Sequence, residues 1–164
     1  MKAEKTFFVD APVDKVMDVM RDPDLITKNE KSRDAVSVEI KDLKKSDKEH
    51  LFDIQTVNYV RGLTGLDKSN TEKNKIAVRW NLRDAVCEWK WTGGGGHAKK
   101  TDITGFDRLV EKGDGTEVTL SVSINIAVPF LGRQLSRTVA REFQKEWLKY
   151  IELVSQWLKS THRQ

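Results

Sequence analysis

Residues 1–25 combine two different hydrophobic periods. Met1–Asp10 alternates apolar and polar positions, which predicts a short strand with one side formed by Ala3, Phe7 and Val9. The next apolar positions are three and four residues apart, the spacing of a helix, at Val13, Val16, Met17 and Met20. We expect Pro12 at the first helical position with Asp10 as its cap, and we expect Asp22-Pro23 to end this helix and begin a second one. The chain therefore opens as a strand followed by two short helices.

The middle of the chain predicts a series of strands joined by turns. Alternation marks six segments: 32–41, 49–60, 75–82, 85–91, 99–111 and 117–128. In the first, the apolar side is Val36, Val38 and Ile40. In the second, Phe52 and Ile54 face inward, and a bulge near Gln55 or Thr56 would explain why Val57 and Tyr59 are the next large residues.

Three further features of this region shape the expected sheet. The polar stretch 61–71 reads as a connection between strands. The inward face of 99–111 is ambiguous between two sets of residues, Ile103/Leu109 and Phe106/Val110. The strand 117–128 has the clearest alternation in the chain, with one face formed by Val118, Leu120, Val122, Ile124, Ile126 and Val128.

From Pro129 to Lys159 the period becomes helical and stays helical. An apolar stripe recurs every four residues at Leu131, Leu135, Val139, Phe143, Trp147 and Ile151. A basic stripe, offset from it by about 200° on a helix of 3.6 residues per turn, runs along Arg133, Arg137, Arg141, Lys145 and Lys149. One amphipathic helix of about 45 Å therefore closes the chain and can cover one face of a sheet.

These elements predict an α+β fold in a single domain, 1–164. Consecutive strands joined by turns form an antiparallel sheet, and half-polar alternation leaves one face of that sheet to water. The expected architecture is a curved sheet of about seven strands wrapped on the long C-terminal helix, with two short helices after the first strand.

Four segments resemble the START-like superfamily, also called the helix-grip, SRPBCC or Bet v 1-like fold, and most nearly its polyketide cyclase/dehydrase and coenzyme-Q-binding branches. They are the opening strand with its Ala-Pro helix start and Asp-Pro stop (7–23), the aromatic strand and glycine-rich turn (89–96), the Gly-Thr-x-Val-Thr entry to the last strand (115–119), and the Pro-Phe-Leu-Gly step into the closing helix (126–132). The resemblance covers the whole chain. It implies a curved sheet gripping the long helix, with an apolar cavity between them.

Composition restricts the classes of function. The 164 residues carry a net charge of +4, which is mild, and we expect no nucleic-acid binding because no concentrated basic patch with interspersed aromatics is seen. The single cysteine, Cys87, permits no disulfide within the chain and suits a reducing compartment. The start does not read as a signal peptide, so we expect a cytoplasmic protein, and we expect a monomer.

Classical catalytic and metal motifs are weak in this sequence. His50, His97 and His162 have no metal-binding spacing, so no metal or other cofactor is expected; His50 should be solvated. Cys87 reads as a small inward hydrophobe rather than a nucleophile. The run Gly93–Gly96 lacks the helix start of a phosphate-binding loop and reads as a strand connection.

The aromatic residues carry the functional hypothesis. Large inward side chains on neighbouring strands and on the closing helix can fill a core or line a cavity, and the resemblance favours lining. The candidate ligand-binding residues are Phe52, Ile54, Tyr59, Trp80, Trp89, Trp91, Ile124, Val139, Phe143 and Trp147. No catalytic residue is predicted.

Three functions fit this pattern. The first is binding or transport of an apolar or amphipathic small molecule, such as a lipid, quinone, isoprenoid or polyketide. The second is a cyclase/dehydratase-type enzyme acting on an aromatic or polyketide substrate. The third is a protein-interaction module with a filled cavity. An acid–base pair facing the cavity would favour the second, and a cavity below ~300 Å³ would count against ligand binding.

The basic stripe adds one possible partner. Such a stripe is most often a solvated helix face, tempered here by Glu142 and Glu146. The sharper interpretation is weak contact of Arg133, Arg137, Arg141, Lys145 and Lys149 with an anionic membrane surface.

Overall fold

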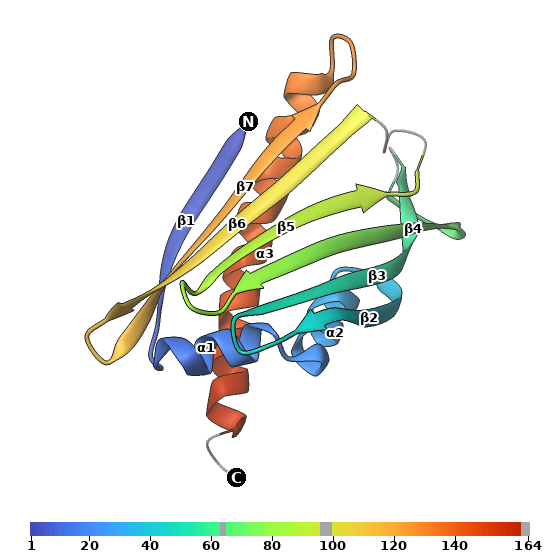
Figure 1. Ribbon diagram of the computed structural model, residues 1–164. Coiled ribbons are helices and arrows are strands. Elements are labelled where there is room, and N and C mark those ends of the chain that lie inside the picture. Colours follow the sequence, from blue (N-terminus) through green and yellow to red (C-terminus); the bar gives the residue numbers. More distant parts are fainter. Residues whose placement is uncertain (63–64, 96–99, 162–164) are drawn as a thin grey trace.

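The computed structural model describes residues 1–62, 65–95 and 100–161, and the predicted α+β fold is confirmed (Figure 1). The strands are β1 (Lys2–Val9), β2 (Ala35–Lys45), β3 (Glu49–Gly62), β4 (Gly65–Asn81), β5 (Val86–Gly93), β6 (Thr101–Lys112) and β7 (Gly115–Ile126). The helices are α1 (Val13–Met20), α2 (Pro23–Ser32) and α3 (Gly132–Thr161).

Within the described residues, seven strands form one antiparallel sheet in the order β1-β7-β6-β5-β4-β3-β2. Strands β2 to β7 are paired in sequence order, and β1 closes the edge beside β7, with Lys2 opposite Ser123. The terminal amino group of Met1 also donates to the carbonyl of Ile124 at 2.9 Å. Figure 1 shows the sheet curving across α3, which runs along one of its faces.

The core lies between the sheet and the helices. On β7 the inward positions Val118, Leu120, Val122 and Ile124 are almost completely inaccessible, as their alternation predicts. Helix α3 packs on β7 and β1, whereas α2 packs on β2. The two helices therefore cover different parts of the concave face.

The start of the chain folds largely as predicted, with one correction. Pro12 is the N-cap of α1 in an extended conformation rather than its first helical residue, and no side chain caps that end. Asp22 is the N-cap of α2, where its carboxylate accepts from the backbone N–H of Asp24 at 2.9 Å, and Pro23 is the first helical residue. The second oxygen of Asp22 accepts from the indole N–H of Trp157 at 2.9 Å, so the same residue fixes the far end of α3.

The expectations for β2 to β4 need correction. Val36 is exposed, because a register irregularity between Ala35 and Ser37 breaks the alternation of β2. In β3 the alternation continues through the buried Thr56, so the expected bulge at Gln55 or Thr56 is wrong; the register of β3 and β4 shifts at Tyr59/Val60 instead. The polar segment 61–71 is not a connection, because β3 extends to Gly62 and β4 begins at Gly65.

Helix α3 also differs from its predicted stripe at the N-terminal end. The predicted apolar stripe places Leu131 and Leu135 on the buried side, but both are exposed. The residues that face the sheet there are Gly132, Ser136 and Ala140, which let the helix approach the backbone closely. From Trp147 onward the predicted apolar stripe is buried, with Ile151, Val154 and Leu158 in the core.

Candidate functional site

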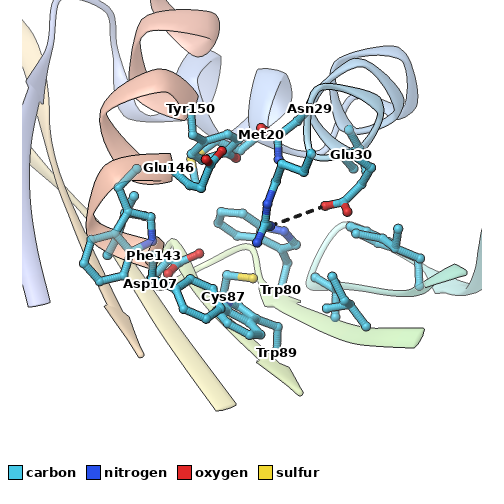
Figure 2. Close-up of a pocket in the computed structure, with 18 residues that line it drawn as sticks. Met20, Asn29, Glu30, Trp80, Cys87, Trp89, Asp107, Phe143, Glu146 and Tyr150 are labelled. Atoms are coloured by element: carbon cyan, nitrogen blue, oxygen red, sulfur yellow. Dashed lines mark ion pairs between the residues drawn. The ribbon is translucent and has the colours of Figure 1, made fainter. Parts of the chain in front are cut away.

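A partly open cavity of about 140 Å³ lies where α2 and α3 diverge over the sheet (Figure 2). Its walls come from the end of α1, from α2 and α3, and from strands β3 to β7. The lining residues are Met20, Ile26, Asn29, Glu30, Arg33, Phe52, Ile54, Ile76, Val78, Trp80, Cys87, Trp89, Asp107, Leu120, Phe143, Glu146, Trp147 and Tyr150.

Aromatic rings form much of the apolar wall. The Trp89 ring on β5 stacks on Phe143 of α3 with 5.8 Å between centroids, and Phe143 meets Trp147 at 6.4 Å. The absence of a side chain at Gly105 on the neighbouring β6 makes room for the indole, since a Cβ atom there would lie 1.8 Å from Cε2 of Trp89. Strand, helix and glycine together fix the orientation of this ring.

The fixed indole holds a carboxyl group inside the cavity. Asp107 lies two positions after Gly105 on the inward face of β6, opposite Leu120 of β7. The indole N–H of Trp89 and the backbone N–H of Ser121 donate hydrogen bonds to its carboxylate. Burial outweighs these bonds and raises the pKa of Asp107 to about 7, so the group divides between its two protonation states near neutral pH.

Three neighbouring acids are also shifted toward their neutral forms. Burial, reinforced by the charge of Asp107, raises the pKa of the Tyr150 phenol on α3 and of the Cys87 thiol on β5. Burial raises the pKa of Glu30 on α2, which the guanidinium of Arg33 partly opposes. Burial in the cavity therefore disfavours the charged form of Asp107, Tyr150, Cys87 and Glu30 alike.

Arg33 lies between the two helices that border the cavity. It is the C-cap of α2, and its guanidinium is 4.0 Å from Glu30 and 5.7 Å from the centroid of the Phe143 ring on α3. Its side chain remains about one-third exposed. A long, partly solvated side chain in this position can move aside at low cost.

Of the ten predicted ligand-binding residues, six line this cavity: Phe52, Ile54, Trp80, Trp89, Phe143 and Trp147. The other four lie outside its lining. Ile124 is packed in the β7 core, Val139 is half-buried on α3, Tyr59 lies near the distal end of β3, and Trp91 lies over Gly93 at the end of β5.

The polar residues of the cavity were missed by sequence reasoning. Asp107 falls in the strand whose inward face was ambiguous, and the structure selects the face of Ile103 and Leu109 while Phe106 and Val110 are exposed. Gly105 and Asp107 occupy two inward positions where alternation would predict apolar side chains, so the sequence pattern of β6 does not show its inward face. Tyr150 precedes the predicted stripe residue Ile151 by one position, and Glu30 and Arg33 gave no signal in a polar helix.

The histidine expectations have different outcomes. His50 is buried rather than solvated: its Nε2 donates to Asp42 at 2.8 Å, and its Nδ1 accepts from Arg21 at 3.1 Å. His97 lies outside the described residues. In the part of the chain that the structure describes, no group of three or more His, Cys, Asp or Glu side chains could hold a metal ion.

No helix among the described residues combines the length and apolar character required to cross a bilayer.

The architecture is a helix-grip fold, and solved structures with this fold align with the chain over nearly its full length. A protein from Thermus thermophilus has a TM-score of 0.65 at 12% identity, covering 98% of this chain and 99% of that one. The Zhui aromatase/cyclase from Streptomyces sp. R1128 has a TM-score of 0.61 at 12% identity, covering 97% of this chain and 93% of that one. A START superfamily protein from Mycobacterium smegmatis has a TM-score of 0.60 at 15% identity, covering 96% of this chain and 98% of that one.

The family itself is given by sequence. The chain belongs to the family DUF2505, described as a protein of unknown function, whose model matches residues 5–158. No curated protein matches the chain. The solved structures share the fold at low identity, so any activity must be argued from the cavity of this chain.

Proposed function

We propose that the protein binds a small amphipathic molecule in the cavity between α2, α3 and the sheet. The apolar body of the ligand contacts the Trp89, Phe143 and Trp147 rings, and one oxygen function of the ligand meets Asp107 and Tyr150. The observation that carries the proposal is the Asp107 carboxyl group on an otherwise apolar face of β6. Burying a carboxyl costs stability that a leucine at the same position would not cost, and such groups concentrate at functional sites.

The size of the cavity limits the ligand. The volume of about 140 Å³ is below the ~300 Å³ at which ligand pockets usually begin, so the expectation of a cavity of at least that size is not met and the result counts against a large ligand. A full-length lipid, quinone, isoprenoid or polyketide needs more room than this. The proposed ligand is therefore either a small ring compound or a longer molecule that displaces the Arg33 side chain from its place between Glu30 and Phe143.

The proposal can be tested with two probes of similar shape. 1-Naphthol and 1-methylnaphthalene share the same ring body, but only naphthol carries a hydroxyl group. By isothermal titration calorimetry we expect the wild-type chain to bind naphthol at least fivefold more tightly than methylnaphthalene. Asp107→Leu should reduce this difference, because the leucine cannot hydrogen-bond the hydroxyl group and only Tyr150 remains to do so.

The matched control is Arg108→Gln on the exposed face of the same strand, which should leave both affinities unchanged. Binding of neither probe, together with no small molecule retained in native mass spectrometry of protein purified from its own host, would contradict the proposal. That result would favour a protein-interaction module with a filled interior.

A second candidate function is proton-transfer catalysis of the cyclase/dehydratase type. The observation that favours it is the pairing, in one cavity, of an acid with a pKa of about 7 and a phenol whose pKa is raised. In a dehydration, the Asp107 carboxylate would take a proton from carbon while a neutral donor such as Tyr150 protonates the departing hydroxyl; the C–O bond breaks, a C=C bond forms and water leaves.

This candidate predicts multiple turnovers of a co-purified ligand, followed by mass spectrometry. Asp107→Asn should abolish turnover while retaining binding, because the amide hydrogen-bonds but cannot accept the proton. A ligand that remains unchanged over long incubation with the wild-type chain would exclude catalysis on that ligand and leave the binding function.

A further inference from the structure

The turn between β7 and α3 exposes an aromatic side chain completely. Phe130 has a relative accessibility of 105% and a positive φ of 65°, a left-handed conformation that bulky residues rarely adopt. The backbone holds the turn: the N–H of Leu131 donates to Pro129 O at 2.8 Å, and the N–H of Gly132 donates to Val128 O at 2.9 Å. Phe130 is therefore displayed by a defined turn and packs on nothing in the protein.

The exposed apolar surface continues into α3. Leu131 is 54% exposed and Leu135 is 40% exposed, because Gly132, Ser136 and Ala140 occupy the face toward the sheet. Gly132 is held so close to the sheet that a Cβ atom there would lie 2.1 Å from the carbonyl oxygen of Ile126. We refer to Phe130, Leu131 and Leu135 as the apolar tip.

Positive charge surrounds the apolar tip. Arg133 and Arg137 follow it on α3, and residues 126–141 contain no aspartate or glutamate. Strand pairing brings further cations to the same end, since the N–H of Ala127 donates to the carbonyl of Lys100 at 2.7 Å and Lys2 lies opposite Ser123. Asp102, opposite Asn125, is an acidic residue at this end of the molecule. Its single negative charge is outnumbered by the positive charges of the Arg and Lys side chains named above.

The basic stripe of α3 consequently has two different halves. Lys145 and Lys149 lie 3.6 Å and 3.4 Å from Glu142 and Glu146, respectively. Among the described residues, no acidic side chain lies within ion-pair distance of Arg133, Arg137 or Arg141, and all three are exposed. The unneutralised half is the half beside the apolar tip.

We propose that this end of the molecule docks on an anionic membrane surface, with Phe130 and Leu131 inserted at the boundary between headgroups and acyl chains and with Arg133 and Arg137 on lipid phosphates. Aromatic and aliphatic side chains flanked by Arg and Lys are the combination that interfacial binding requires. The tip is a narrow projection beyond the end of the sheet (Figure 1), whereas a stable protein partner needs about 800 Å² of matching surface on each side. The shape and the charge together favour the lipid surface.

The test is co-sedimentation of the full chain with vesicles of phosphatidylcholine alone and of phosphatidylcholine with 30% phosphatidylglycerol. We expect at least tenfold more protein on the anionic vesicles, decreasing with added salt as screening requires. Phe130→Ala/Leu131→Ala should reduce the bound fraction at least fivefold. Arg133→Gln/Arg137→Gln should reduce it as much and remove most of the salt dependence.

Two matched controls separate docking from general surface effects. Leu148→Ala removes a leucine of α3 that is also 54% exposed, and Lys145→Gln/Lys149→Gln removes the two cations that have acidic neighbours. Both should stay within twofold of wild type, and circular dichroism should show all variants folded. Equal binding to the two vesicle types, no binding to either, or equal losses in controls and tip variants would overturn the proposal; so would unaltered binding of the Phe130→Ala/Leu131→Ala variant.

Discussion

Strands β7 and β6 are neighbours in the sheet, yet their inward faces serve different purposes. The inward positions of β7 are an unbroken aliphatic series from Val118 to Ile124, nearly inaccessible throughout. On β6 the corresponding face has Ile103 and Leu109 at its ends, with Gly105 and Asp107 between them. Strand β7 therefore packs into a solid core, whereas β6 has no apolar side chain at two inward positions and borders a cavity that contains a carboxyl group.

The largest expected effect on stability comes from truncating a buried side chain of the solid core beside β7. Ile124→Ala should lower the free energy of unfolding by about 2–5 kcal/mol, because close-packed neighbours cannot fill the space. Trp147→Ala removes a larger side chain, but Trp147 also lines the cavity, so we expect a loss of about 3 kcal/mol, the low end for such truncations. Urea denaturation measures both. A loss near 5 kcal/mol for Trp147, with unchanged naphthol affinity, would assign Trp147 to the solid core.

The second effect tests the cavity side through pH. The pKa of Asp107 is about 7 in the folded chain and near 3.8 in the unfolded chain, so the folded state binds more protons between these values and stability falls as pH rises from 4 to 7. The side chain is only half-buried, so this contribution is at most about 4 kcal/mol. Asp107→Asn should remove it and be more stable than wild type at pH 8.

The control for this experiment is Asp102→Asn, an exposed aspartate on the same strand, which should keep the wild-type pH dependence. Thermal unfolding of the three proteins at pH 5, 6, 7 and 8 provides the comparison. Parallel curves for wild type and Asp107→Asn would show that the carboxyl is solvated and would weaken the proposed site.

The smallest effect concerns the glycine under the indole. Gly105→Ala forces Trp89 to move, since its Cε2 atom is 1.8 Å from the position of the new Cβ. We expect a loss of about 1–3 kcal/mol and a shift in tryptophan emission as the indole leaves Asp107 and Phe143. Adding Trp89→Phe should restore part of the stability, because the smaller ring leaves room for the methyl group; a fully additive double mutant would argue against this contact.

The sequence predicts regions where one physical requirement dominates. The alternation of β7 and the Asp22-Pro23 boundary are each decided locally, by burial of one face and by proline sterics, and both are confirmed. The same holds for the stripe of α3 after Trp147. These features were sufficient to predict the order of elements and the fold class.

The sequence misleads where two requirements compete. On β6, the inward face has Gly105, which makes room for Trp89, and Asp107, which places a carboxyl group in the cavity. The inward face is therefore no more apolar in sequence than the outer face. In β3, the buried Thr56 donates a hydrogen bond to Asn58 at 2.6 Å. A polar residue at an inward position interrupts the apolar alternation in the same way as a bulge does. At the start of α3, close approach to the sheet selects small residues and leaves Leu131 and Leu135 outside. Such residues depend on neighbours distant in sequence.

The pairing of β1 with β7 also imposes an order of events during synthesis. Lys2 can pair only after Ser123 has been synthesised. At roughly 5–20 residues per second, translation from Lys2 to Ser123 takes about 6–24 s. The hairpins from β2 to β6 can form in the meantime, because each joins adjacent segments. Strand β1, with Phe7, Phe8 and Val9, therefore has no sheet partner until β7 has been synthesised, so its backbone hydrogen-bonding groups stay unpaired during that interval.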